Sequence, residues 1–223
     1  MIDARAVVFD FDGVLADTEG LHLRAFQDAL AARGWTLTRA DYVARYLGYD
    51  DRDMVHAFAE DTRATFSAAD IDAILLDKAR LYDQRLAAGS VLFDTAAAAI
   101  ARLGARYRLG IASGSFHGEI AAILAANNLT HAIAVVVGAD DVRRSKPAPD
   151  PYAAAVEALG VPPSRAVAIE DSQWGLISAR AAGLRTIGVT TSHPAGALAH
   201  ADVVVGGLDD VTAELVDSLL GLR

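Results

Sequence analysis

The chain of 223 residues contains no cysteine, few prolines and no long hydrophobic run. Without cysteine there is no disulfide, no thiolate nucleophile and no zinc–thiolate site. Hydrophobic stretches such as Ala132–Val137 are far shorter than the roughly 20 residues that a membrane-spanning helix needs. The N-terminal residues also lack the pattern of a secretory signal peptide. We therefore expect a cytoplasmic protein that makes no contact with a membrane.

Basic residues are also in short supply. Lysine and arginine together number 20, against 29 aspartate and glutamate residues, which gives a formal net charge of -9. A nucleic-acid-binding surface needs clustered positive charge, so this composition argues against a nucleic-acid partner. A small anion can still bind where a few positive groups or a metal ion are placed locally.

Hydrophobic residues make up 53% of the chain, which excludes a disordered protein. In the second half, short β-branched or apolar runs alternate with alanine-rich helical patterns, which predicts βαβ units and a doubly wound parallel sheet of the α/β class. The predicted strands are Ala6–Phe9, Leu109–Ala112, Ile133–Val137, Ala166–Ile169, Thr186–Val189 and Asp202–Val205. The predicted helices lie near Thr95–Leu103, Glu119–Ala126, Pro151–Leu159, Leu176–Ala182 and Val211–Leu220.

A long helical stretch interrupts this alternation between the first and second strands. Its helices are expected at Leu21–Arg33, near Ala40–Tyr46, near Asp51–Ala59, and from the capping box Ser67–Asp70 to about Ala87. Because no strand pattern occurs within it, we interpret residues 18–87 as an all-helical domain. It is inserted into a core formed by residues 1–17 and 88–223.

Polar side chains collect where the predicted strands end. In an open parallel sheet, ligands bind outside the carboxyl ends of the strands, so these side chains are expected on one rim. The residues concerned are Asp10 and Asp12 after the first strand, Ser113, Gly114 and Ser115 after the second, and Glu170 and Asp171 after Ala166–Ile169. Lys146, in the loop after Ile133–Val137, is the only lysine in the second half of the chain.

Carboxylates that converge on one rim repel each other and need a positive counter-charge. Mg²⁺ suits such a site, because it prefers carboxylates, carbonyls and water, with a substrate phosphate completing its shell. Asp10 can then act as a nucleophile that forms an aspartyl-phosphate, and Asp12 as a general acid and base. Lys146 would offset charge on the transferring phosphoryl group, and the Ser113 hydroxyl would orient it.

Four segments carry a resemblance to a known family. They are Asp10–Glu19 (DFDGVLADTE), Ile111–Ser115 (IASGS), Ser145–Tyr152 (SKPAPDPY) and Ile169–Gly175 (IEDSQWG). In this order they resemble the haloacid dehalogenase superfamily of phosphohydrolases, and within it the β-phosphoglucomutase-like group, which has a helical cap after the first strand. The resemblance covers essentially the whole chain and implies that residues 18–87 are such a cap.

The resemblance implies a role for each matching residue. Asp10 corresponds to the phosphorylated nucleophile and Asp12 to the acid that protonates the leaving oxygen. The residues that hold the phosphoryl group correspond to Ser113, Gly114, Ser115 and Lys146. The Mg²⁺ ligands correspond to Asp10, the carbonyl of Asp12, Asp171 and Glu170. A second carboxylate at position 12 is typical of the phosphatase and mutase branches rather than of the dehalogenases.

The helical domain is expected to select the substrate. Lys78 falls on an otherwise apolar helical stripe, where it can reach a substrate anion. By resemblance to the mutase group, His22 and Lys78 correspond to substrate contacts, and Arg52 does so with its register shifted by one residue. After Ser115, however, this chain has Phe116 and His117 where the mutases carry a basic residue and an amide.

We therefore predict a Mg²⁺-dependent phosphatase that acts on a small phosphorylated metabolite, preferentially a sugar phosphate, as a monomer or weak homo-oligomer. The first alternative is a β-phosphoglucomutase-type mutase, which His22 and Lys78 favour and which Phe116-His117 and the shifted Arg52 disfavour. The second alternative is a binding protein that keeps the fold without turnover. Such a protein should lack a motif residue, and none is missing here.

Overall fold

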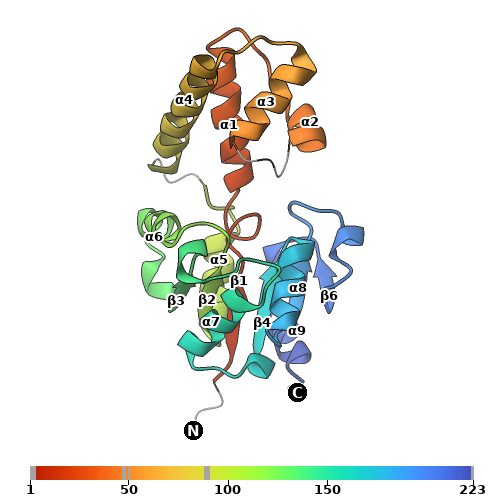
Figure 1. Ribbon diagram of the computed structural model, residues 1–223. Coiled ribbons are helices and arrows are strands. Elements are labelled where there is room, and N and C mark those ends of the chain that lie inside the picture. Colours follow the sequence, from red (N-terminus) through yellow and green to blue (C-terminus); the bar gives the residue numbers. More distant parts are fainter. Residues whose placement is uncertain (1–3, 47–48, 50, 88–90, 222–223) are drawn as a thin grey trace. The chain divides into compact units, whose positions relative to one another are not determined.

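The computed structural model describes residues 4–46, 49, 51–87 and 91–221 (Figure 1). The chain divides into two compact units. The first, which we call the sheet unit, is formed by Met1–Asp17 and Leu92–Arg223; the second, the helical unit, is Thr18–Val91. The predicted domain boundary at residues 87 and 88 falls where residues 88–90 lie outside the described part of the chain.

The sheet unit is built on parallel strands in the order β3-β2-β1-β4-β5-β6, within the described residues. The strands are β1 (Ala6–Phe9), β2 (Arg108–Ala112), β3 (Val135–Val137), β4 (Ala166–Glu170), β5 (Arg185–Val189) and β6 (Val203–Val205). Every pairing between neighbours is parallel. The predicted α/β class with a doubly wound parallel sheet is confirmed.

The central strand β1 is buried along its whole length, which explains why its sequence is continuously apolar rather than alternating. Helices α7 (Asp150–Leu159) and α8 (Gln173–Ala181) cover one face of the sheet, and α5 (Ala96–Gly104) and α9 (Ala213–Leu219) cover the other (Figure 1). Side chains of β1, β4, α7 and α8 share one apolar cluster. Helix α6 (His117–Ala126) packs beside β3.

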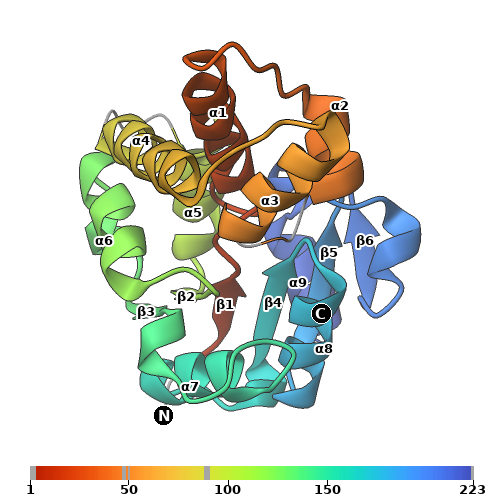
Figure 2. The ribbon, with the colours of Figure 1, turned by 45° about the horizontal axis from the view of Figure 1, so that its top comes forward.

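The register of the sheet fixes which residues stand level with one another. Phe9 of β1 is paired with Ile111 of β2 on one side and with Ile169 of β4 on the other. The chain leaves all three strands at the same edge, so Asp10, Ala112 and Glu170 start from the same level. The loops that follow these residues therefore meet at the carboxyl edge of the sheet, as the sequence predicts (Figure 2).

The helical unit consists, in its described part, of α1 (Thr18–Ala31), α2 (Arg39–Asp41), α3 (Asp51–Thr62) and α4 (Ala68–Ala87). A π-helical segment, Tyr42–Tyr46, continues α2 where the sequence suggests a single α-helix. The predicted capping box is present at the start of α4, because Ser67 N donates to Asp70 Oδ2 at 2.9 Å and Asp70 N donates to Ser67 Oγ at 3.2 Å. Phe26, Tyr42 and Phe58 contribute to the unit's own apolar core.

Some helix ends differ from the prediction for identifiable reasons. Helix α7 begins at Asp150, one residue earlier than predicted, and the Asp150 carboxylate accepts two hydrogen bonds from Arg144. Helix α8 begins at Gln173, three residues earlier than predicted, because the Ser172 hydroxyl accepts a hydrogen bond from Gly175 N and caps the first turn. In the described part of the chain, no helix is both long and apolar enough to cross a membrane.

Candidate active site

Asp10 follows β1 directly and is buried, with 7% of its surface exposed. Its main-chain N–H donates to Ile169 O of β4 at 2.9 Å, which holds the residue level with the end of that strand. One carboxylate oxygen, Oδ1, accepts a hydrogen bond from Phe11 N at 2.7 Å and lies 2.8 Å from Lys146 Nζ. Strand β1 thus delivers a buried carboxylate to the centre of the carboxyl edge.

Glu170 is the last residue of β4 and has no exposed surface. Within the described chain its carboxylate accepts hydrogen bonds from Lys146 Nζ, Tyr152 Oη, Asp171 N, Ser172 N and Ser172 Oγ, at 2.6–3.1 Å. Burial alone would raise the pKa of Glu170, but Lys146 and the Ser172 donors outweigh it and lower the pKa. Glu170 therefore stays ionised and anchors Lys146.

Lys146 lies between the two carboxylates. Its ammonium is 2.8 Å from Asp10 Oδ1 and 2.6 Å from Glu170 Oε1, and it sits 5.1 Å from the centre of the Tyr152 ring. Burial favours the neutral amine, but the charges of Asp10 and Glu170 more than offset this and raise the pKa of Lys146. The side chain is therefore a fixed positive charge beside the predicted nucleophile.

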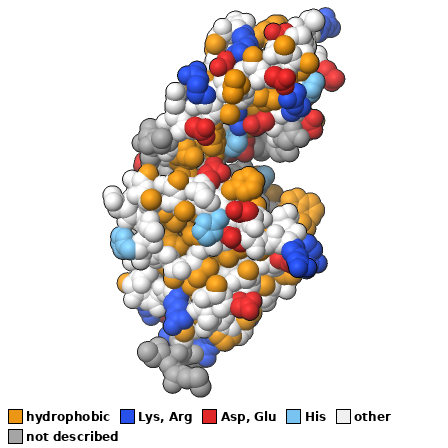
Figure 3. All heavy atoms as spheres, turned by 60° about the vertical axis from the view of Figure 1, so that its left-hand side comes forward, with side chains coloured by type: hydrophobic (Ala, Val, Ile, Leu, Met, Phe, Trp, Pro, Cys, Tyr) orange, Lys and Arg blue, Asp and Glu red, His pale blue; other side chains and the backbone are white. Residues whose placement is uncertain are grey.

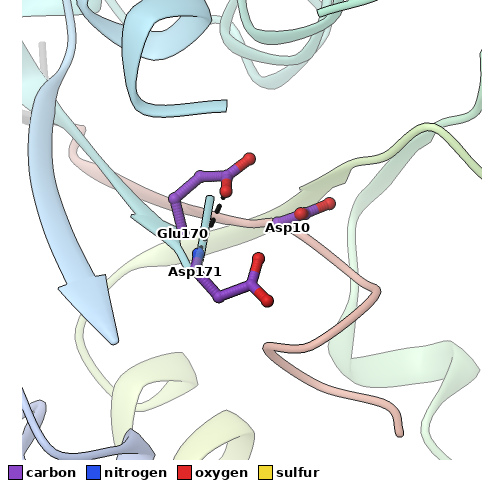
Figure 4. A group of neighbouring side chains, drawn as sticks. All are labelled: Asp10, Glu170 and Asp171. Carbon is purple, nitrogen blue, oxygen red and sulfur yellow. Dashed lines mark hydrogen bonds between the residues drawn. The ribbon is translucent and has the colours of Figure 1, made fainter. Parts of the chain in front are cut away.

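The carboxylate of Asp171 lies near those of Asp10 and Glu170 (Figure 4). Burial, followed by the charge of Glu170, raises its pKa to about 7, while a hydrogen bond from Ser192 acts in the opposite direction. Gly13 lies close against it: with φ at +74°, a Cβ at this position would come within 1.9 Å of Asp171 Oδ2. Only glycine leaves room for the carboxylate here.

The three buried acids form a cluster that suits a cation. Oxygen atoms of Asp10, Glu170 and Asp171 lie within 4.8 Å of one another. Burial and the neighbouring carboxylates, Glu170 above all, raise the pKa of Asp10 well above its usual value even though Lys146 lowers it. One lysine therefore does not neutralise the cluster, and an added divalent cation would favour the ionised forms of Asp10 and Asp171. The carbonyl of Asp12 stays a predicted metal ligand.

Asp12 faces the loop that follows β2. Its Oδ2 atom accepts hydrogen bonds from Ser113 Oγ at 3.0 Å and from Ser115 Oγ at 2.7 Å. Ser113 Oγ also accepts a hydrogen bond from Ser115 N at 3.0 Å, which tightens the loop. Gly114 between them is exposed, and a Cβ there would meet nothing within 4 Å. The structure thus brings Asp12, Ser113 and Ser115 together. At Gly114 it leaves room for a side chain, so no close packing requires glycine there.

The three residues predicted in the helical unit do not behave alike. Lys78 of α4 is 3% exposed, and its ammonium lies 2.6 Å from Asp51 Oδ2 and 2.8 Å from His22 Nδ1. The rings of Phe26 and Tyr82 are each centred 5.1 Å from the same ammonium. Lys78 and His22 therefore belong to one polar cluster of the helical unit.

Arg52 stands apart from this cluster. It pairs instead with Asp72 of α4 at 2.5 Å, and both side chains are more than half exposed. The structure therefore brings His22 and Lys78 together and leaves Arg52 on the surface of the unit.

Two contributors to the site were not identified from the sequence. Tyr152 is completely buried and donates from Oη to Glu170 Oε1 at 3.1 Å. A tyrosine among alanines on the buried face of α7, six residues after Lys146, was the available signal. The loop after β5 also reaches the site, because Thr191 donates to Gly13 O and Ser192 hydrogen-bonds to Asp171. The run of hydroxyl residues Thr190–Ser192 directly after the predicted strand Thr186–Val189 was the available signal.

Comparisons with known proteins agree with this geometry. The model of a family described as haloacid dehalogenase-like hydrolase matches residues 7–189. Protein CbbY of Rhodobacter capsulatus is 35% identical over 208 residues, covering 87% of this chain and 89% of that protein. Validoxylamine A 7'-phosphate phosphatase of Streptomyces hygroscopicus subsp. limoneus is 30% identical over 208 residues, covering 93% of this chain and 95% of the relative.

Solved structures show the same fold at full length. The crystal structure of CbbY from Rhodobacter sphaeroides in complex with phosphate has a TM-score of 0.74 and 30% identity, and covers 96% of this chain and 99% of that one. A CbbY structure from the same organism in complex with xylulose-1,5-bisphosphate has a TM-score of 0.71 and 31% identity, with 93% and 96% covered. The resemblance indicated by the four sequence motifs is confirmed.

Proposed function

The chain belongs to the haloacid dehalogenase-like hydrolases and is a phosphatase, and from this premise we propose that it releases phosphate from a sugar phosphate through an aspartyl-phosphate on Asp10. One observation carries the assignment of the nucleophile. Asp10 is the carboxylate at the end of the central strand, 2.8 Å from a lysine that is itself held by Glu170. A phosphoryl group at this position would lie beside a fixed positive charge.

Mg²⁺ is the cation that we propose for the cluster of Asp10, Glu170 and Asp171, because these are hard oxygen donors that burial has left short of positive charge. When bound, it would offset negative charge on the phosphate and keep Asp10 ionised. Glu170 already accepts hydrogen bonds at both of its oxygens. We therefore assign Glu170 mainly to holding Lys146 in position, and we assign Asp171 to binding the metal.

The reaction then needs two steps at Asp10. A carboxylate oxygen of Asp10 attacks phosphorus, the bond from phosphorus to the sugar oxygen breaks, and Asp12 gives its proton to that departing oxygen. Asp12 next takes a proton from water, whose oxygen attacks the same phosphorus and releases inorganic phosphate and free Asp10. Ser113 and Ser115 hold Asp12 in place through their hydroxyl groups, and Lys146 stabilises the phosphoryl oxygens.

We propose that the helical unit is the cap that selects the substrate, with His22 and Lys78 as contacts for its hydroxyl or anionic groups and Arg52 as a weaker one. Support comes from Asp51, whose side chain is 46% exposed while Lys78 is almost fully buried. The aspartate can therefore be exchanged for a substrate anion without moving the lysine. The cysteine-free composition suits a cytoplasmic enzyme, and we propose a monomer or weak homo-oligomer.

Phosphorus NMR of the protein with Mg²⁺ and a panel of hexose and pentose phosphates tests this proposal. Growth of the inorganic phosphate signal is expected, and Asp10→Asn should reduce its rate at least about a thousandfold, because the covalent step disappears. Asp209→Asn, an exposed acid of the sheet unit, is the matched control and should leave the rate unchanged. Isomerisation of β-glucose 1-phosphate without phosphate release would instead identify a mutase.

A further inference from the structure

Two aromatic side chains are exposed beside the proposed active site. Phe116 is 65% exposed and Trp174 is 59% exposed, and both belong to the few large hydrophobic side chains at the surface of the described chain. Phe116 follows β2 and Trp174 follows β4, the two strands that flank β1. Each lies five residues beyond the isoleucine that pairs with Phe9. On either side of the nucleophile strand, an exposed aromatic residue therefore stands at the start of the helix that follows the neighbouring strand, Phe116 just before α6 and Trp174 in the first turn of α8.

The position of Phe116 is fixed by contacts on both sides. Before it, Ser115 donates to Asp12 Oδ2 at 2.7 Å and accepts at its carbonyl from Ala139 N at 2.9 Å. After it, His117 N donates to Asp140 Oδ1 at 2.8 Å, and His117 Nδ1 lies 2.7 Å from Asp141 Oδ2. The exposure of Phe116 is thus imposed by an ordered turn that is tied to Asp12.

The position of Trp174 is fixed in a comparable way by the first turn of α8. Ser172 caps this turn through Gly175 N at 3.1 Å and donates to Glu170 Oε2 at 2.9 Å. A Cβ at position 175 would come within 1.5 Å of Glu170 Oε1, so the turn lies directly against that carboxylate. Trp174 lies between Ser172 and Gly175 in the sequence, so the geometry of this turn also fixes its exposed position.

Most of the basic side chains near the carboxyl edge of the sheet already form ion pairs. Lys146 pairs with Asp10 and Glu170, Arg144 with Asp150, and His117 with Asp141. Arg143 is the other basic residue in the loop that leads to Lys146, and it is exposed. Figure 3 shows hydrophobic side chains at the surface of the sheet unit next to acidic and histidine side chains. This edge of the sheet unit therefore offers the leaving group apolar surface more than positive charge.

We propose that Phe116 and Trp174 determine substrate specificity by contacting the apolar faces of a ring-shaped leaving group, that of a cyclic sugar phosphate. Aromatic side chains offer a large apolar surface at low conformational cost, and ligand sites commonly combine such surfaces with a few fixed polar groups. This inference rests on the proposed function, because it assigns a role in the same site. Under it, phosphate esters of short acyclic alcohols are poorer substrates than cyclic ones.

The test compares the protein with Phe116→Ala and Trp174→Ala on a cyclic sugar phosphate, such as glucose 6-phosphate or ribose 5-phosphate, and on acyclic glycerol 3-phosphate. Each variant should raise KM for the better cyclic substrate about tenfold through lost apolar contact, with kcat little changed. KM for glycerol 3-phosphate should stay within about twofold. Phe116→Tyr and Trp174→Phe keep an aromatic ring and should restore most of the affinity.

The controls separate the possible failures. Leu76→Ala removes an equally exposed hydrophobic side chain of α4 and should leave both KM values unchanged. Equal effects of the aromatic variants on cyclic and acyclic substrates would overturn the inference while leaving the phosphatase intact. A larger effect from Arg143→Ala on a substrate with a second anionic group would overturn it as well. If the unaltered protein releases phosphate from no member of the panel, the proposed function fails, and the inference fails with it.

Discussion

The chain has two lysines, and little of either side chain is exposed, 12% for Lys146 and 4% for Lys78, but their surroundings differ. Lys146 lies in a loop of the sheet unit against two carboxylates whose side chains are 9% and 0% exposed. Lys78 lies in the middle of α4 against one carboxylate that is 46% exposed, a histidine nitrogen and two aromatic rings. Lys146 offsets part of the negative charge of Asp10 and Glu170, two acids that are themselves buried.

The carboxylate partner of Lys78, Asp51, is exposed enough for water to solvate it when the lysine does not contact it. Burial of a lysine therefore does not by itself identify its task, and the exposure of its partner is more informative. A buried partner ties the lysine to the stability of the site. A half-exposed partner leaves the lysine available to exchange one anion for another.

Of the substitutions at the two lysines, Lys146→Met is expected to have the largest effect on the unfolding free energy and on kcat. Without the ammonium, Asp10 and Glu170 become an uncompensated buried acid pair, which typically costs about 3–5 kcal/mol of unfolding free energy. The proposed phosphatase should lose about a thousandfold in kcat, since the charge beside the phosphoryl group is also gone. Chemical denaturation and steady-state kinetics measure the two effects. Lys146→Arg serves as the matched variant: it should recover most of the stability and little of the activity.

Lys78→Met should have a smaller effect of a different kind. Asp51 remains solvated, so the unfolding free energy is expected to fall by only about 1 kcal/mol. If Lys78 contacts the substrate, KM rises about tenfold while kcat changes much less. A fall in kcat comparable with that of Lys146→Met would mean that the two lysines act on the same step, and the contrast between them would be lost.

The effect of a divalent metal ion on the stability of the buried acid cluster at Lys146 should depend on pH. In the metal-free protein Asp171 has a pKa of about 7 against an ordinary 3.8, so the folded state holds this proton more tightly than the unfolded state. Its contribution to stability is therefore present at low pH and is lost as pH rises toward 7. Mg²⁺ competes with that proton.

Adding Mg²⁺ should consequently raise Tm by several degrees at pH 8 and by little at pH 5. Differential scanning fluorimetry across pH provides the measurement. In Asp171→Asn the pH dependence should be weaker, with the part due to Asp10 remaining, and most of the Mg²⁺ effect should be lost. A Mg²⁺ shift that is the same at both pH values would show that Asp171 does not take part in metal binding.

The smallest effect is expected at Arg52. Because its ion pair with Asp72 is mostly exposed, Arg52→Ala should change the unfolding free energy by no more than about 0.5 kcal/mol. As a proposed substrate contact it should raise KM about threefold, measured alongside Lys78→Met. An unchanged KM would remove Arg52 from the substrate site and leave Lys78 and His22 as the proposed contacts of the helical unit.

The parts that the sequence predicts well are those governed by local pattern. The apolar run Ala6–Phe9 identifies β1, and the rule that ligands bind at the carboxyl ends of parallel strands places Asp10 next to Glu170 and Asp171. The capping box at Ser67 likewise marks the start of α4, because its geometry depends on four consecutive residues.

Other features depend on contacts between distant segments, which no local pattern encodes. The hydrogen bond of Tyr152 to Glu170 joins α7 to β4, and the pair of His117 with Asp141 joins the start of α6 to the short helical turn Ala139–Asp141. The partner of Lys78, Asp51, lies 27 residues away along the chain. The π-helical turn at Tyr42–Tyr46 escapes prediction for a similar reason, since both of its buried tyrosines belong to the core of the helical unit.

The hydrogen bonds of Glu170 have a consequence for how the protein loses activity on heating. Its donors come from the turn after β4, from α7 and from the loop of Lys146, while Gly175 of α8 lies against the same carboxylate. Three segments of the sheet unit must therefore be in place before Lys146 can be held beside Asp10. Fraying of any one of them dismantles the proposed site, so thermal inactivation and cooperative unfolding of the sheet unit should share one midpoint. The amide protons of Asp171 and Ser172 should exchange with solvent as slowly as those of the central strand.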